Sequence, residues 1–214
     1  MKTTRGLITL CVLAGLSALA QAQSVPKIKD GDKLAVDFST YDTRGREVYV
    51  AKVDKIDSSV SMQEKTYTWT SPLSTTIYQR GTHTITDRAP PGGAMQEVPE
   101  KQRFSWFPAG GDFSKVQSGS VGIHNQRCGE GTFKYEAASA PVKFKISIAG
   151  QALELNGQEV TFKGKWTNTC GTGDQVIRYV YSPDLDYVVE RDLKVFQPNA
   201  ILSTGNNVKV TAVN

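Results

Sequence analysis

Excess charge of one sign is the first thing that this sequence lacks. Its 214 residues carry 25 Lys and Arg against 21 Asp and Glu, a formal net charge of +4. So weak a balance excludes a strongly basic nucleic-acid binder and gives no reason to expect an acidic partner. With 39% hydrophobic and 21% charged residues, the chain has the composition of a globular domain, not a disordered one. We therefore expect a folded protein that binds no nucleic acid.

Long hydrophobic runs are also missing, apart from one near the N-terminus. The run Leu7–Leu19 has 13 residues, too few for a helix across a bilayer core of about 30 Å. Lys2 and Arg5 precede it and Ala20–Ala22 follows it, the pattern of a secretory signal that is cleaved after Ala22. The pattern predicts a signal peptide over 1–22, with an uncleaved anchor as the alternative. The remainder, 23–214, is then an exported domain that does not span the membrane and lies in the periplasm or outside the cell.

Cysteine is scarce, with three residues in all. Cys11 lies inside the apolar run and follows Leu10, where a lipoprotein site has a small residue, so lipidation is disfavoured. Cys128 and Cys170 are each followed by Gly-x-Gly, and neither belongs to a C-x-x-C pair. An even number of cysteines in an oxidising compartment, without metal-site spacing, predicts a disulfide between Cys128 and Cys170. Free thiols and a redox pair are the alternatives.

Residues typical of catalytic and metal sites are few. The exported part has two histidines, His83 and His124, and no H-x-H, H-E-x-x-H or paired C-x-x-C spacing. A G-x-S-x-G nucleophile elbow and a phosphate-binding loop are absent from the sequence as well. We therefore expect no cofactor, no metal ligand and no catalytic residue. The alternative is a hydrolase with an unusual site that uses His83 or His124.

Helical periodicity is nearly absent, whereas alternation of apolar and polar residues is frequent. In Asp32–Thr40, Leu34 and Val36 share one face, as in a half-buried strand. Pro and Gly interrupt the pattern at 89–99, the candidate division between two sub-sheets, and Asn156-Gly157 predicts a hairpin turn. The pattern predicts an all-β protein with little or no helix, an antiparallel sandwich or partly open barrel of about ten strands. We expect strands over 32–40, 47–56, 65–70, 74–85 with a break at Gly81, 102–107, 132–135, 142–148, 159–169, 175–181, 187–196 and 208–213.

Aromatic residues make up 9% of the chain, and several stand at strand positions that suit contact with a ligand. The candidate ligand-facing residues are Trp69, Trp106, Trp166, Tyr179 and Tyr181. The alternative is that they fill the core, since each large ring buries roughly 150–250 Å² there. A half-barrel lined by such rings predicts an apolar or amphipathic ligand as the partner.

Short motifs are spread over most of the exported part: Asp30–Leu34 with Tyr41–Gly45, Phe104–Pro108, Gly157–Thr161, Tyr179–Leu185 and Val188–Glu190. Together they resemble uncharacterised exported β-rich proteins of Gram-negative bacteria, which form a domain family of unknown function. The chain departs from that pattern at Phe162–Trp166, where the family has a "PAGtF" strand end. The resemblance implies a location in the cell envelope and no known chemistry.

These observations favour an exported, non-enzymatic β-domain that acts as a binding or structural module of the cell envelope. A carrier of lipid or of peptidoglycan fragments is the alternative, and a hydrolase is the less favoured one. The expected partner is an envelope component or a small apolar ligand.

Overall fold

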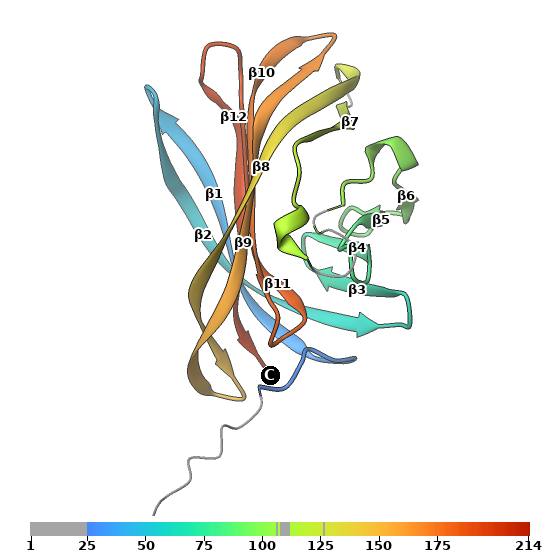
Figure 1. Ribbon diagram of the computed structural model, residues 1–214, viewed down its shortest axis with the longest axis vertical. Coiled ribbons are helices and arrows are strands. Elements are labelled where there is room, and N and C mark those ends of the chain that lie inside the picture. The colour runs from blue at the N-terminus through green and yellow to red at the C-terminus, as the bar shows by residue number, and fades with distance from the viewer. Residues whose placement is uncertain (1–24, 106, 108–111, 126) are drawn as a thin grey trace, which may run out of the picture.

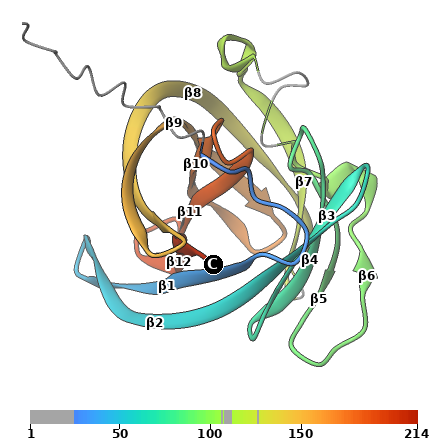
Figure 2. The ribbon, with the colours of Figure 1, turned by 90° about the horizontal axis from the view of Figure 1, so that it is seen from below.

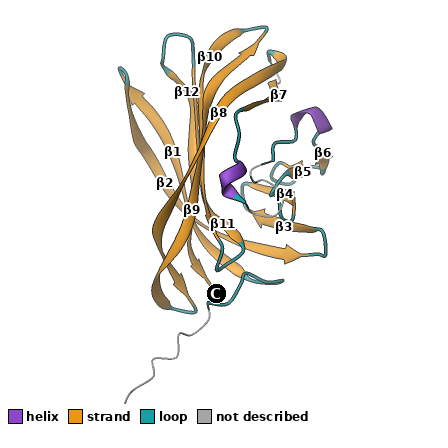
Figure 3. Cartoon of the chain, in the orientation of Figure 1, coloured by secondary structure: helices purple, strands orange, loops and turns teal. Residues whose placement is uncertain are grey.

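The computed structural model of the chain describes residues 25–105, 107, 112–125 and 127–214, so the predicted signal peptide lies outside it. In this part twelve strands form one sheet (Figure 1), and the helical elements described are two 3₁₀ turns (Figure 3). The prediction of an all-β protein with little or no helix is therefore confirmed. The elements are β1 (Lys33–Arg44), β2 (Glu47–Met62), β3 (Thr66–Ser71), β4 (Ser74–Gln79), β5 (Ile85–Ala89), β6 (Gln96–Glu97), η1 (Glu100–Gln102), η2 (Phe113–Lys115), β7 (Gly119–Asn125), β8 (Gly129–Ile148), β9 (Gln151–Asn168), β10 (Gly171–Ser182), β11 (Tyr187–Phe196) and β12 (Leu202–Val213).

The sheet curls until two of its inner strands meet. Its order is β6-β5-β4-β3-β2-β1-β12-β11-β10-β9-β8-β7, and neighbouring strands are antiparallel. At one end, Ala212 and Val213 of β12 pair in parallel with Ser147 and Ile148 of β8, and the N–H of Ala149 donates to the Val213 carbonyl at 3.0 Å. Strands β8 to β12 thus curl into a ring at this end (Figure 2). Of the two expected architectures, the partly open barrel is the one that forms.

The longest hairpin, β8–β9, turns at Ala149-Gly150. Both residues have positive φ, 48° and 81°, as a type I′ turn requires. The turn predicted at Asn156-Gly157 is wrong, because both residues lie inside β9. With the turn at 149–150, β8 and β9 form 18 residue pairs. A turn at 156–157 would make the hairpin shorter and would lose some of these pairs. Gly157 instead permits a close approach to β10, since a Cβ there would lie 3.0 Å from Val180.

The strand expected over 102–107 does not form. This segment begins in η1, and residues 103–105 have no strand pairing. Its Phe104 ring lies edge-on against Tyr135 and Phe162, with ring centroids 5.3 and 4.7 Å apart. The apolar residues of the segment therefore cover a face of the sheet and do not extend its edge.

The strands expected over 132–135 and 142–148 are parts of one strand, β8. Pro141 lies between them and lacks the N–H that an inner strand would use. It is tolerated because 136–146 pair only with β9, while β7 ends its pairing at Tyr135 and β12 begins at Ser147. The segment 89–99, the expected division between sub-sheets, connects β5 with β6 of the same sheet.

Two apolar clusters lie at different heights of the sheet. The first is mainly aliphatic and includes Leu34, Ile148 and Val213, next to the ring closure. The second is mainly aromatic and includes Phe133, packed with Phe104 and Phe113 from the segment that crosses the sheet. We call the end where β12 meets β8 the closed end, and the other end of β8, next to Cys128, the open end.

Candidate functional site: a cleft and an aromatic chamber

A cleft of about 850 Å³ lies at the open end. Strands β9 to β12 form its floor, and β5, β7 and the segment around η1 form its walls. Phe104, Ile123 and Leu193 contribute apolar surface, while amides such as Gln175 and Asn168 contribute hydrogen-bonding groups. The volume and the mixed lining are typical of small-molecule sites, which hold about 300–1,000 Å³.

Trp166 lies on the floor of the cleft, as part of β9. Its indole N–H donates to the carbonyl of Phe196 at 2.9 Å, which fixes the orientation of the ring. The ring lies close against β10 at Gly173, where a Cβ would come within 2.7 Å of Trp166 Nε1. Gly173 therefore makes room for the indole, and the side chain remains only partly buried. This arrangement leaves a held aromatic ring in contact with the cleft.

The charged side chains that line the cleft are arginines, and a histidine lies beside them. Arg88 of β5, His124 of β7 and Arg127, which follows β7, lie on its walls, and all three are exposed. None of the described lining residues is acidic. Glu130, which follows closely in the chain, is paired with Lys101 at 2.5 Å and is not a lining residue. The cleft therefore favours a neutral or anionic ligand over a cationic one.

The predicted disulfide forms part of this cleft. Cys128 and Cys170 are bonded with Sγ atoms 2.11 Å and Cα atoms 5.4 Å apart, and both line the cavity. The bond joins the residue before β8 to the turn between β9 and β10. Thr169 adds a hydrogen bond from its hydroxyl to the Cys128 carbonyl at 2.6 Å. The prediction of a Cys128–Cys170 disulfide is confirmed, and the bond reinforces the ends of the neighbouring strands β8, β9 and β10 next to the pair Gly131–Asn168.

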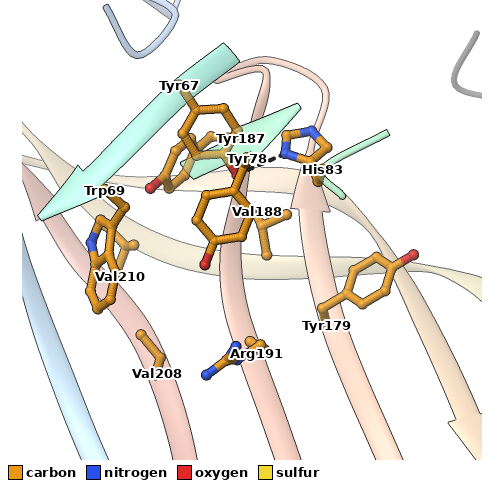
Figure 4. A pocket seen from close by; sticks show the side chains of 10 residues that line it. All are labelled: Tyr67, Trp69, Tyr78, His83, Tyr179, Tyr187, Val188, Arg191, Val208 and Val210. Atoms are coloured by element: carbon orange, nitrogen blue, oxygen red, sulfur yellow. Dashed lines mark hydrogen bonds between the residues drawn. The ribbon is translucent and has the colours of Figure 1, made fainter. Parts of the chain in front are cut away.

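A second, smaller cavity of about 60 Å³, which we call the chamber, lies between β3–β4 and the strands β10 to β12 (Figure 4). Tyr67 and Tyr78 stack in one wall, with ring centroids 4.8 Å apart and planes only 9° from parallel. Trp69 and Tyr187 add further aromatic surface, and Val188, Val208 and Val210 complete the apolar lining. Arg191 of β11 is the one permanently charged lining residue, among the described residues.

The tyrosine hydroxyls of the chamber stay neutral at physiological pH. Burial raises the pKa of Tyr67 well above its ordinary value, and it also raises the pKa of Tyr78 and of Tyr187. The positive charge of Arg191 opposes the rise at Tyr67 and Tyr78 without cancelling it. The chamber therefore holds uncharged hydroxyl groups and one cation.

His83 lies at the rim of the chamber, with only 4% of its surface exposed. Its Nδ1 is 2.9 Å from the hydroxyl of Tyr67, and its ring meets Phe107 edge-on with centroids 4.6 Å apart. Burial lowers the pKa of His83 to about 4, while the carboxylate of Asp186 acts in the opposite direction. The imidazole is therefore neutral at neutral pH, and it links the β4–β5 turn to the aromatic surface below.

The two histidines considered for a hydrolase are not brought together. His83 lines the chamber, whereas His124 lies on β7 and lines the cleft. The hydrogen bond that His83 makes is to a tyrosine whose pKa is raised, and Tyr67 is therefore no readily ionised nucleophile. His83 packs against Phe107 and bonds to Tyr67 inside the aromatic cluster.

The five aromatic candidates are distributed over both cavities. Trp166 lines the cleft, and Trp69 and Tyr179 line the chamber. Tyr181 lines neither; its hydroxyl donates to Asp186 at 2.6 Å and its ring packs on Phe107. Trp106 lies outside the described residues.

Sequence reasoning missed Arg191. The β10–β11 ladder contains a β-bulge, because Tyr181 pairs with Val188 while Val180 pairs with Glu190. The extra residue shifts the alternation by one, so that Val188 and Arg191, three positions apart, line the same chamber. A strict period of two from Tyr187 also places Arg191 on the chamber side, because both residues line the chamber and lie four positions apart. Alternation in 187–196 is therefore a signal for Arg191, whereas the place of Val188 depends on the bulge.

Comparisons with known proteins give little. No family model matches the chain, and no curated protein matches it. Among solved structures, a protein described as a "putative lipoprotein" from Parabacteroides distasonis ATCC 8503 is similar at a TM-score of 0.40 and 12% identity. The match covers 88% of this chain and 97% of that one. A likeness of this strength carries no argument about function.

The helical elements in the described part of the chain are the short 3₁₀ turns η1 and η2. No helix in this part of the chain has the length and apolar character needed to cross a bilayer.

Proposed function

We propose that this protein is an exported, non-enzymatic module of the cell envelope that binds a small amphipathic ligand in the cleft beside Trp166. The observation that carries the proposal is the cleft itself: about 850 Å³ with a fixed indole in its floor and no acidic residue among the described lining residues. The protein then holds or carries its ligand and does not convert it.

The lining supports an amphipathic ligand over a purely apolar one. The indole of Trp166 and the side chains of Phe104 and Leu193 offer flat apolar surface. Around them, Gln175 and Asn168 present amide groups that donate and accept hydrogen bonds. A ligand with both an apolar face and polar substituents satisfies both kinds of group, because polar atoms left unpaired in a buried site lower affinity.

The disulfide supports export. Cysteine pairs persist in oxidising compartments such as the periplasm and are rare in the cytosol. Here the pair lies in the wall of the proposed site, so formation of the bond and shape of the cleft are coupled. Together with the leader pattern over 1–22, this places the protein, in our proposal, in the periplasm or outside the cell.

The test is a mass-spectrometric search for a ligand that co-purifies with the protein. The full chain is produced with its leader, the N-terminus of the product is sequenced, and the purified protein is extracted with organic solvent. We expect a product that begins near Gln23 and an extract that contains a small amphipathic molecule. The same experiment is run on Trp166→Ala and on the matched control Tyr49→Ala, which removes an exposed ring from β2.

The ligand should be lost from Trp166→Ala and retained by Tyr49→Ala. Thermal melting of each variant shows whether it is folded. An extract without any small molecule above the solvent blank, or equal ligand content in folded Trp166→Ala and wild type, would overturn the proposal. For a Trp166→Ala protein that fails to fold, Trp166→Phe replaces it and should retain a reduced amount of ligand.

A further inference from the structure

The cleft and the chamber adjoin along two strands. On β11, Arg191 lines the chamber, and Leu193 and Val195, further along the strand, line the cleft. On β12, Val208 lines the chamber and Thr204 lines the cleft. The four residue-to-residue steps of strand from Arg191 to Val195 span about 13 Å. An elongated molecule that lies along these strands would therefore touch both cavities.

Arg191 has no counter-ion in the described part of the chain. Its side chain makes no hydrogen bond or ion pair with any described residue, although the residue is partly buried. Its acidic neighbours along β11 bond elsewhere: Glu190 accepts from Arg178 at 2.7 Å, and Asp192 is paired with Lys194 at 2.5 Å. A guanidinium carries five N–H donors in a planar fork that matches a carboxylate. The group is thus available to an acidic ligand.

The surroundings of Arg191 favour a single carboxylate. The chamber holds one permanent cation within apolar and aromatic walls, and its volume of about 60 Å³ is small beside the roughly 850 Å³ of the cleft. One guanidinium neutralises a monoanion, whereas a phosphate dianion would keep a buried charge without a partner, which is unfavourable. The valines beside Arg191 suit methylene groups next to the acidic group.

We infer that the chamber receives the acidic end of an elongated ligand whose body lies in the cleft, with Arg191 as the counter-ion of a carboxylate. This inference rests on the proposed function and names its ligand class: a monocarboxylate amphiphile of the fatty-acid type. The carboxylate accepts two N–H bonds from the Arg191 guanidinium, and the chain passes over Val208 toward Leu193 and Trp166.

The test compares two probes that differ in charge and hardly in shape, decanoate and decanol. Binding to the solvent-extracted protein is measured by isothermal titration calorimetry and by quenching of tryptophan fluorescence, since Trp69 lines the chamber and Trp166 the cleft. We expect wild type to bind decanoate about tenfold or more tightly than decanol, the gain of a charge-assisted bidentate pair. Arg191→Met should abolish this preference by weakening decanoate alone.

The matched control is Arg46→Met, which removes an exposed arginine that lines neither the cleft nor the chamber. This variant should keep the preference for decanoate. Arg191→Gln serves as the second variant, so that a misfolded Arg191→Met protein does not leave the question open, and it should also lose the preference. Arg191→Lys keeps the charge without the planar fork and should retain part of it.

Three outcomes overturn the inference: decanoate and decanol bind wild type equally, neither binds, or folded Arg191→Met and Arg191→Gln keep the wild-type preference. Each of them leaves the proposed function standing if a co-purified ligand is still lost in Trp166→Ala. If the decanoate preference and the Trp166-dependent ligand were both absent, the proposed function would be overturned together with this inference.

Discussion

The two ends of the sheet are held together by different means. At the closed end, backbone hydrogen bonds between β12 and β8 complete the ring, above a cluster of aliphatic side chains. At the open end no strand pairing closes the described sheet, and the Cys128–Cys170 bond links the neighbouring ends of β8, β9 and β10 on one side of the opening. The cleft lies at this second end.

The difference shows how a β-domain can have a cavity and remain folded. Ring closure satisfies backbone groups that a free edge would expose, but it draws the strands together and fills the space between them with side chains. A disulfide joins two chain segments through their side chains and leaves the surface beside it open. The closed end is therefore held by backbone pairing and filled with side chains, whereas the open end is stabilised by a covalent bond and keeps its cleft.

The largest effect is expected from removing the covalent link of the open end. Replacing both cysteines, Cys128→Ser with Cys170→Ser, should lower the free energy of unfolding by about 4 kcal/mol, since the bond closes a loop with a sequence separation of 42. Urea unfolding of the oxidised wild type and of the double variant measures the difference. A double variant as stable as wild type would show that the closed end alone holds the fold.

His83, between the two clusters, gives the next effect, through pH. Its folded pKa of about 4 lies below the ordinary 6.5, so between these values the unfolded chain binds a proton that the folded protein does not. Protonation of the unfolded chain therefore lowers the free energy of unfolding as the pH falls from 6.5 toward 4, by up to about 3 kcal/mol. Above pH 6.5 His83 has no such effect, because it is neutral in both states. Wild type should lose more stability on acidification than His83→Asn, whose side chain tolerates the positive φ of 50° at this position.

Urea unfolding at several pH values between 4 and 7 tests this expectation, with His124→Asn as the control for loss of an exposed histidine. Parallel curves for wild type and His83→Asn would contradict it and would show that burial of the imidazole carries no cost.

Weakening the closed end should have a smaller effect. Val213→Ala removes two methyl groups from the aliphatic cluster, where the side chain is 8% exposed, and leaves the backbone pairing with Ile148 in place. We expect a loss of about 2 kcal/mol, from the buried methyl groups and the space they leave. Thermal unfolding measures it, and ligand binding in the cleft should be unchanged. Loss of binding would mean that the two ends are not independent.

The smallest effect is expected at the surface of the β8–β9 hairpin. Lys143 and Glu154 form an ion pair at 3.3 Å, with side chains 69% and 50% exposed. Glu154→Gln should change stability by less than about 1 kcal/mol, because water and salt screen such pairs. The melting temperature of Glu154→Gln measures the contribution of the surface ion pair, and that of Val213→Ala measures the contribution of the buried cluster at the closed end. A larger loss would indicate that the hairpin depends on this pair.

Local patterns in the sequence predicted much of the sheet. Alternation gave the bounds of β11, 187–196, and parity of the cysteines gave the disulfide. Local patterns gave a wrong prediction where a distant partner overrides local preference. Asn156-Gly157 has the residues of a turn, yet pairing with β8 keeps this segment extended. The ring closure itself joins residues more than sixty positions apart, such as Ile148 and Val213, and leaves no mark in either segment.

The candidate site could be predicted only in part. Trp69, Trp166 and Tyr179 were predicted to face a ligand, and each of them lines one of the two cavities. Their ring size and their place in alternating strands were sufficient for this prediction. Their division between cleft and chamber depends on how the sheet curls. Arg191 lies four positions after Tyr187 in an alternating strand, so its face could be predicted from the sequence, but the strands β3 and β4 that lie opposite it could not.

The pairing of β1 with β12 has a consequence for how the chain reaches its folded state. Lys33 and Asn214 exchange two backbone hydrogen bonds, so the first strand finds one of its neighbours only when the last one is present. Contacts of such sequence separation form slowly, because a long segment must be ordered before they are gained. The first hairpin therefore stays unpaired on one side until β12, at the end of the chain, is available to pair with it.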